Sequence, residues 1–311
     1  MSDYQFRAAT PADDPALLAL YEAAFGKGFS PEWWAWYFAC PTGRDRVAVA
    51  ELDGQLAGAY GLLPYRLWLN GREVAASLCQ NVCTHPDHQG RGLFVRLGHH
   101  ALDAEGARGV SVCLGMPNSK ALPGHLKVGW DEAAPLPFLV KEHDAIRPRR
   151  NRCVEVDAFD PRVDALMERI RERFAFLVLK DHAFLNWRFR ARPGQQYAIH
   201  QVEDGDLVRG YVVLKRFDDG DRRKAHILDL HAEDEGALAE LLAAAEEHAC
   251  LSHELNGWTN PLDPYREQML AAGFVERASA DRLIVYWNAG AAPEPFDGGA
   301  VWFCLSDNDV Y

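Results

Sequence analysis

The chain has 311 residues, of which 48% are hydrophobic, and a formal net charge of −12. This length and hydrophobic content are typical of a globular protein with a sizeable core, and the length favours two domains. The acidic balance disfavours general nucleic-acid binding, which needs a basic face to displace counterions.

The cysteines and the hydropathy pattern bear on the compartment. Seven cysteines without a Cys-x-x-Cys pair favour free thiols in a reducing compartment over a disulfide framework. No apolar run reaches the roughly 18 residues of a membrane-spanning helix, and the first seven residues lack a basic and then apolar signal pattern. We therefore expect a cytoplasmic protein that does not bind membranes.

The first predicted elements alternate between strand and helix patterns. Residues 4–9 alternate like an edge strand, and residues 10–13 (Thr-Pro-Ala-Asp) predict the start of an amphipathic helix. Residues 30–32 (Ser-Pro-Glu) predict the start of a second, aromatic-rich helix. A strand over 46–52 then ends at an Asp-Gly turn and leads into a second strand.

Residues 81–94 combine the end of a strand, a glycine-rich turn and the start of a helix. Gly90 and Gly92 permit a tight turn, and apolar residues at helical spacing begin at Leu93. The amides of the first helical turn would face the glycine turn, as in sites that bind phosphate groups. The P-loop and the dinucleotide fingerprint are both excluded, because the Lys-Ser/Thr pair and the third glycine are missing.

A second motif follows a short strand over 110–116. Residues 118–130 read Asn-x-x-Ala-x-x-x-His-x-Lys-x-Gly-Trp, and residues 89–92 read Gln-x-x-Gly. Together they resemble two motifs of the GNAT superfamily of acetyl-CoA-dependent N-acetyltransferases, Asn-x-x-Ala-x-x-x-Tyr-x-Lys-x-Gly-Phe and Gln/Arg-x-x-Gly-x-Gly/Ala. The sequence departs from these patterns at Phe94, where the family has a small residue, and at His125, where it has tyrosine. Pro123 and Gly124 also predict a short, irregular helix.

The resemblance implies a site for acetyl-CoA or another short acyl-CoA. In the family, the backbone at the end of the central strand pairs with pantetheine and polarises the acyl carbonyl. The implied cofactor-binding residues are Val82, Cys83, Thr84, Gln89, Gly90, Arg91, Gly92, Leu93, Phe94 and Asn118.

By position, His125 takes the place of the acid that protonates the departing thiolate. An imidazole with an ordinary pKa of about 6.5 can donate a proton near neutral pH. The alternative is a surface histidine at a helix end.

The general base is missing from the central strand, because residues 77–84 contain no carboxylate. A water chain through Gln80 or Asn81 is one alternative. In some tandem GNAT-like chains the terminal carboxylate enters the active site, and residues 301–305 predict a strand that leads to the end of this chain. The resulting candidates are Asp307, Asp309 and the carboxylate of Tyr311.

Two further types of site lack the partner residues that their chemistry needs. Cys79 and Cys83 invite a nucleophilic mechanism, but no paired base is evident, and cysteines in strands are usually small core residues. His85 and His88, and the pair at 99–100, lack the cysteine or acidic partners of a zinc signature, so we expect no metal.

The second half of the sequence repeats the first. Trp36 stands seventeen residues before Asp53, as Trp187 does before Asp204, and each aspartate opens an Asp-Gly turn. The repeat predicts strands over 196–202, 225–230 and 254–258 and helices over 236–248 and 264–272. The second copy's equivalent turn, residues 231–236, has one glycine and three acidic residues, which would repel CoA. The second copy is therefore predicted to be degenerate.

The predicted fold class is α/β with mixed sheets, in two GNAT-like domains. Each has a central, mostly antiparallel, splayed sheet flanked by helices. The predicted boundaries are an acyl-CoA-binding domain over 1–145, a basic linker over 146–153, the degenerate domain over 154–290, and a tail over 291–311 that reaches the active site.

The predicted function is N-acetyl or short-acyl transfer from CoA to a primary amine of a small molecule, by direct attack in a ternary complex. The aromatic helix would line the acceptor pocket or serve only as core. The alternatives are a non-catalytic acyl-CoA sensor and an aminoacyl transferase that uses charged tRNA. Neither the acceptor nor the oligomeric state follows from the sequence.

Overall fold

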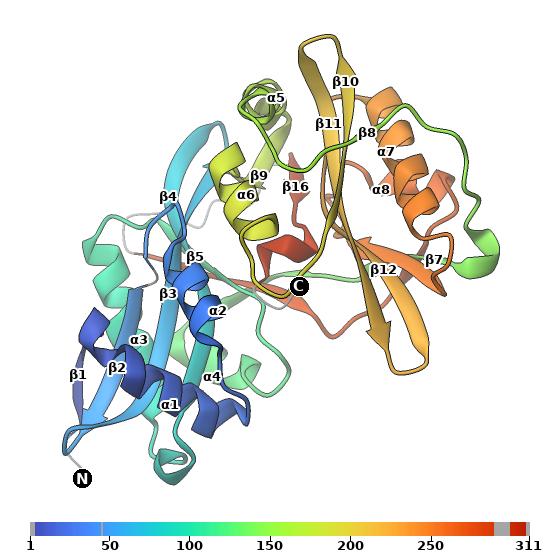
Figure 1. Cartoon of the computed structure of the whole chain (residues 1–311). Coiled ribbons are helices and arrows are strands. Elements are labelled where there is room, and N and C mark those ends of the chain that lie inside the picture. The colour runs from blue at the N-terminus through green and yellow to red at the C-terminus, as the bar shows by residue number, and fades with distance from the viewer. Residues whose placement is uncertain (1–3, 45, 289–298, 309–311) are drawn as a thin grey trace. The chain divides into compact units, whose positions relative to one another are not determined.

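The computed structural model describes residues 4–44, 46–288 and 299–308. The chain forms two compact units (Figure 1). The first is built from residues within 1–66, 74–134 and 281–293, and the second from residues within 67–73, 135–280 and 294–311. These two groups of residues differ from the domains predicted with boundaries at 145, 153 and 290. The two units are defined by contacts within each group, so the boundaries of independently folding domains stay a prediction.

The first unit is organised around a mixed sheet in the order β1-β2-β3-β4-β5-β15-β6. β1 pairs with β2, β2 with β3 and β5 with β15 in antiparallel fashion, whereas β4 and β5 are parallel. The strands are β1 (Gln5–Ala8), β2 (Arg46–Leu52), β3 (Gln55–Leu69), β4 (Arg72–Thr84), β5 (Val112–Gly115), β6 (Asp131–Pro135) and β15 (Arg282–Trp287).

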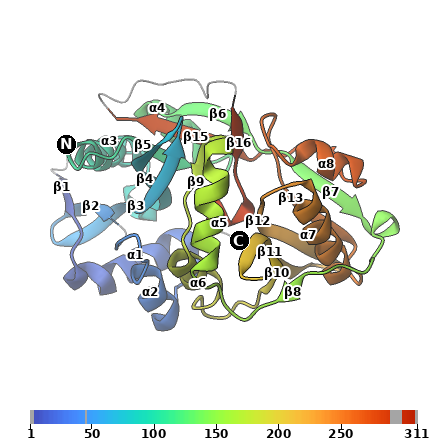
Figure 2. The same ribbon diagram turned by 90° about the horizontal axis from the view of Figure 1, so that it is seen from above.

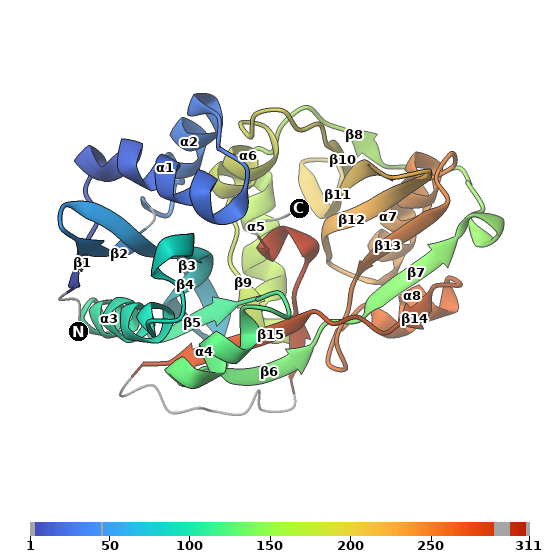
Figure 3. The same cartoon turned by 90° about the horizontal axis from the view of Figure 1, so that it is seen from below.

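Helices cover both faces of this sheet (Figures 2 and 3). Alternate residues of β2 point to opposite faces, so Val47 and Val49 pack with α1 and α2 whereas Ala48 and Ala50 pack with α3 and α4. The predicted start of the aromatic helix is confirmed, because the side chain of Ser30 accepts a hydrogen bond from Trp33 N at 3.1 Å. The helices are α1 (Asp14–Phe25), α2 (Pro31–Phe38), α3 (Leu93–Ala107) and α4 (Leu122–Val128).

The sheet opens between β4 and β5. Their register joins Ala76–Leu78 to Val112–Leu114, yet β4 continues to Thr84 while β5 ends at Gly115. Asn81 has a φ of 52°, a left-handed conformation that interrupts the regular pleat of β4. The last residues of β4 therefore present a strand edge toward the opening, as the predicted splayed sheet requires.

The second unit contains a sheet of the same plan, in the order β14-β7-β13-β12-β11-β10-β8. β12 and β13 are parallel and pair only where Lys224–His226 meet Glu254–Asn256. The parallel pair of the first unit, β4 and β5, is joined over a similarly short stretch. The strands are β7 (Phe138–Glu142), β8 (Val154–Glu155), β10 (Ala198–Asp204), β11 (Leu207–Asp219), β12 (Arg222–Ala232), β13 (Glu254–Trp258) and β14 (Val275–Arg277).

Helices also cover two faces of this second sheet. On one face, Gly210 of β11 leaves room for the side chain of Leu241 of α7. The next residue of β11, Tyr211, points to the opposite face and contacts the ring of Phe159. Figures 1 and 2 show α5 and α6 on one side of β10 and β11 and α7 on the other. The helices are α5 (Arg162–Ile170), α6 (His182–Phe189), α7 (Glu235–His248) and α8 (Arg266–Ala271).

The C-terminal strand is shorter than the sequence predicts. β16 spans Ala300–Trp302 and pairs in parallel with β9 (Phe174–Val178), after which residues 305–307 form a 3₁₀ turn. The prediction of a strand through 305 is wrong, because the Asp307 carboxylate accepts a hydrogen bond from Cys304 N at 2.8 Å and turns the backbone away from the ladder.

Candidate active site

The glycine turn before α3 forms an open concave stretch of backbone. Gly90 and Gly92 have φ values of 73° and 71°, which an L side chain adopts only with strain. Gly92 is the residue that precedes the first turn of α3, and no side chain caps that end of the helix. The free amides and positive end of the helix macrodipole therefore stay available to an anion, as a phosphate site requires.

Hydrogen bonds hold the flanks of this turn in place. Gln89 Nε2 donates to Thr84 O at 3.4 Å, which ties the turn to the end of β4. The Arg91 guanidinium donates to Asp87 O at 3.0 Å and to Tyr4 Oη at 3.1 Å. Arg91 is therefore oriented and exposed beside the turn, where its charge would favour a phosphate group.

The end of β4 offers backbone rather than thiol chemistry. The Cys83 side chain is buried, and burial raises its pKa to about 12, so its thiolate form is disfavoured. The side chain of Val82 packs against the cluster that contains Leu93 and Leu97 of α3. This geometry argues against a nucleophilic Cys83 and leaves the strand edge as the feature that a ligand could pair with.

His125 lies in an aromatic cluster instead of at the surface. It is only 4% exposed, and its ring makes edge contacts with Tyr60, Phe94 and Trp130 at centroid distances of 5.9, 5.0 and 5.3 Å. Desolvation in this cluster lowers its pKa to about 4. The imidazole is therefore neutral at pH 7. Its pKa lies well below the ordinary value that we expect from the sequence.

Tyr60 sets the orientation of this imidazole. Trp130 Nε1 donates to Tyr60 Oη at 3.1 Å, and Tyr60 Oη stands 3.1 Å from His125 Nδ1. The Tyr60 hydroxyl also interacts with Cys79. We assign its proton to the hydrogen bond with His125 Nδ1, which leaves the ring proton on Nε2. Sequence reasoning missed Tyr60 and the hydrogen bond from Trp130, because their partners are distant in the chain.

Phe94, the main departure from the family's loop pattern, is explained by Gly124. A Cβ added to Gly124 would lie 2.7 Å from a carbon of the Phe94 ring, so the ring occupies the space above the glycine. The same ring contacts His125. The bulky residue at the start of α3 and the glycine in α4 therefore compensate each other, and the two departures from the pattern are one packing feature.

Replacing Gly124 by alanine is expected to destabilise the protein by about 1–3 kcal/mol through overpacking, although alanine normally favours a helix. The free energy of unfolding from denaturant titration measures this effect. The same substitution made together with Phe94→Ala should cost much less. Equal costs in the two backgrounds would contradict the proposed packing pair.

The remaining predicted site residues differ in what the structure describes. Asn118 Oδ1 accepts hydrogen bonds from Lys120 N and Ala121 N, both at 3.0 Å, so it caps the turn before α4 and leaves its NH₂ group as the donor for a ligand. Tyr311 and Asp309 lie outside the described residues. Asp307 forms an ion pair with Lys180 at 2.8 Å within the second unit.

The equivalent helix start in the second unit is already capped. The Asp234 carboxylate accepts a hydrogen bond from Ala237 N at 2.9 Å at the start of α7 and also contacts Arg209. One carboxylate thus occupies the position that an anion would take in the first unit.

Comparison with known proteins agrees with this geometry. Models of the acetyltransferase (GNAT) domain match residues 5–133 and residues 177–278. The two matches and the repeated splayed sheet define a tandem GNAT architecture. The chain belongs to the GNAT superfamily of acetyltransferases, and such domains generally use acetyl-CoA or another acyl-CoA.

Several solved structures share the fold across nearly the whole chain. A GCN5-related N-acetyltransferase from Anabaena variabilis is 15% identical, with a TM-score of 0.75 over 91% of this chain and 72% of that one. A probable N-acyltransferase from Enterococcus faecalis is 12% identical, with a TM-score of 0.74 over 92% and 73%. Eis1 from Mycobacterium abscessus is 17% identical, with a TM-score of 0.66 over 92% and 73%. No curated protein sequence matches this chain.

Within the described ranges, no helix is long and apolar enough to cross a membrane.

Proposed function

We propose that the first unit binds an acyl-CoA and transfers its acyl group to a primary amine of a small molecule. The observation that carries this proposal is the conjunction of an uncapped helix start after Gly92 and an open strand edge at the end of β4. Phosphates would bind at the first and pantetheine would extend along the second, pairing with backbone groups of Val82–Thr84.

The chemistry follows from the acceptor and the thioester. A neutral amine attacks the carbonyl carbon, the carbon–sulfur bond breaks, and the proton of the attacking nitrogen passes to water. A backbone amide at the end of β4 would stabilise the developing oxyanion. His125 is proposed to donate a hydrogen bond from Nε2 to the departing thiolate, with Tyr60 holding the ring in that tautomer. The neutral ring acts as a hydrogen-bond donor and not as an imidazolium acid.

Mass spectrometry of the purified protein, followed by a thiol-release assay over a panel of amines, tests this function. We expect a bound CoA thioester and CoA release that depends on the amine. Tight binding without thiol release for any amine would favour the acyl-CoA sensor, a reading supported by the absence of a carboxylate in residues 77–84. Failure to bind acetyl-CoA or CoA at all would refute the proposal.

The chain is expected to bind one CoA and not two. Asp234 fills the anion position of α7 in the second unit, whereas no side chain caps α3 in the first. Isothermal titration calorimetry with CoA gives the stoichiometry. Two equivalents per chain, or one equivalent that survives disruption of the turn at Gly92, would contradict this assignment of the site.

A further inference from the structure

Three metal-ligating side chains meet inside the second unit. Asp229 and His231 lie two residues apart on β12 and so share a face, and Cys304 follows β16. All three side chains are buried, with exposures of 0%, 0% and 3%. Their ligand atoms lie within 4.8 Å of one another. We name them the Asp229–His231–Cys304 cluster.

The spacing in this cluster suits tetrahedral coordination. Asp229 Oδ1 is 3.6 Å from His231 Nε2 and 3.4 Å from Cys304 Sγ. Zinc binds sulfur at about 2.3 Å and nitrogen or oxygen at about 2.0–2.2 Å, so its ligand atoms stand about 3.3–3.7 Å apart in a tetrahedron. These two separations fall in that interval, and the ligand atoms of His231 and Cys304 lie within 4.8 Å of each other.

His231 supplies the independent sign of a missing ligand. Within the described part of the chain, neither of its ring nitrogens has a hydrogen-bond partner, although the residue has no exposure to solvent. An unsatisfied buried polar group is costly, and native proteins rarely leave one without a partner. A metal ion on Nε2 would satisfy the nitrogen that faces Asp229.

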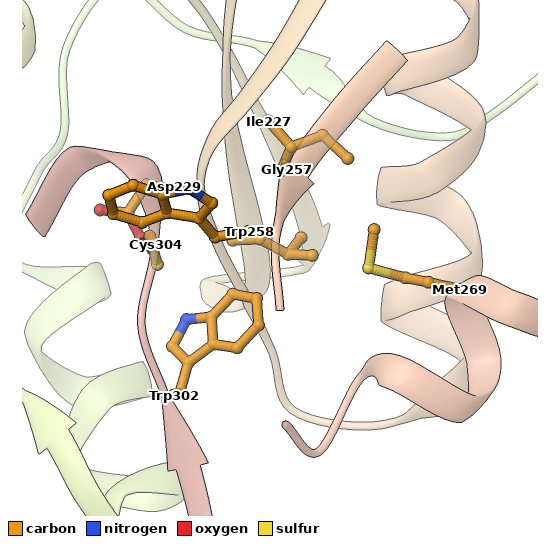
Figure 4. Close-up of a pocket in the computed structure, with 8 residues that line it drawn as sticks. Ile227, Asp229, Gly257, Trp258, Met269, Trp302 and Cys304 are labelled. Carbon is orange, nitrogen blue, oxygen red and sulfur yellow. Dashed lines mark hydrogen bonds between the residues drawn. The ribbon is translucent and has the colours of Figure 1, made fainter. Parts of the chain in front are cut away.

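A small cavity adjoins the cluster. Its volume is about 10 Å³, and both Asp229 and Cys304 line it, together with Trp258 and Trp302 (Figure 4). That is close to the space one water molecule needs. A water there would complete a site with three protein ligands.

The neighbouring lysine binds a different carboxylate oxygen of Asp229 from the one that contacts Cys304. Lys180 Nζ lies 2.8 Å from Asp229 Oδ2 and 2.8 Å from Asp307 Oδ1, and Ser306 Oγ donates to Oδ2 at 2.9 Å. Tyr211 Oη donates to Oδ1 at 3.4 Å. The lysine thus engages the carboxylate oxygen that faces away from the cluster.

The ligand atoms of the cluster favour a divalent transition metal, which would displace the thiol proton of Cys304 on binding. A thiolate, an imidazole and a carboxylate together form a donor set typical of zinc.

We propose that Asp229, His231 and Cys304 bind a divalent transition metal, with zinc as the best match to the donor set. The metal ties β12 to the segment after β16. Because the site is closed, the ion enters as the chain folds and is retained afterwards. This proposal is independent of acyl transfer and stands or fails on its own measurement.

Metal content and a cobalt spectrum test the site. The full chain, produced without a histidine tag, is unfolded with a chelator and refolded with Zn²⁺ or Co²⁺, then dialysed. We expect one metal per chain by plasma mass spectrometry and a thiolate-to-cobalt charge-transfer band in the near ultraviolet. Cys304→Ser should abolish the band, whereas the control Cys153→Ser, in the segment before α5, should keep it.

The wild-type protein alone decides the outcome, so a Cys304 variant that fails to fold does not block the test. If the wild-type chain refolds to its native circular dichroism spectrum in excess Co²⁺ and retains neither metal nor the thiolate band, the proposal is wrong. The cluster would then be an acid that accepts a hydrogen bond from a thiol, beside a buried imidazole.

Discussion

Replacing Gly92 by valine is expected to lower the affinity for CoA at least about 100-fold, a loss of about 2.7 kcal/mol, while the protein stays folded. The left-handed conformation at this position, with a φ of 71°, costs a β-branched residue about 1–2 kcal/mol. Relief of that strain would rotate the backbone and move the amides of the first turn of α3 away from the phosphates. Calorimetric titration with CoA measures the change in affinity.

Gly109 provides a matched control at the other end of α3. It also has a positive φ, 80°, and a Cβ added there would meet nothing within 4 Å, as at Gly92. Gly109→Val should therefore lower the free energy of unfolding by a similar amount and leave CoA binding unchanged. Equal losses of affinity in both variants would show that the effect is global destabilisation and that the turn does not form the site.

Elements defined by local sequence were predicted well. The strands over 46–52 and 254–258 have the predicted bounds, and the Asp-Gly turns at Asp53 and Asp204 form the tips of two hairpins. Each of these signals lies within a few residues, where alternation of apolar residues and turn chemistry decide the backbone. The glycine turn of the candidate site was predictable for the same reason.

Features that depend on residues distant in the chain were not predictable. Tyr60 and His125 are 65 residues apart, and Asp229 and Cys304 are 75 apart, so no local pattern indicates either contact. The ordinary pKa expected for His125 was wrong because the sequence does not indicate that this residue is buried. The histidine follows a proline and a glycine, which predict an irregular segment. Packing of Phe94 over Gly124 closes that segment and removes the ring from solvent.

The buried His125 leads to the second large effect. His125→Phe is expected to lower kcat about 100-fold, because a positioned hydrogen-bond donor to the leaving thiolate is lost. The KM for acetyl-CoA should change little, since the turn at Gly92 is untouched. His125→Gln, which keeps an N–H donor, should recover part of kcat. If phenylalanine and glutamine variants lose activity equally, the imidazole serves packing alone.

The acid stability of the same variants gives a readout independent of activity. The folded pKa of about 4 lies below the ordinary value of 6.5, so the unfolded chain binds more protons between these pH values. The free energy of unfolding therefore falls as the pH drops from about 6.5 to 4, by up to about 3 kcal/mol for this residue. In His125→Phe this part of the decline should disappear, although His248, whose pKa is lowered to about 4, keeps its own contribution. Denaturant titrations of both proteins across pH 4–7 measure the difference. Parallel stability profiles would mean that the folded pKa of His125 equals its ordinary value of about 6.5, and an imidazolium acid near neutral pH would then replace the neutral donor in the mechanism.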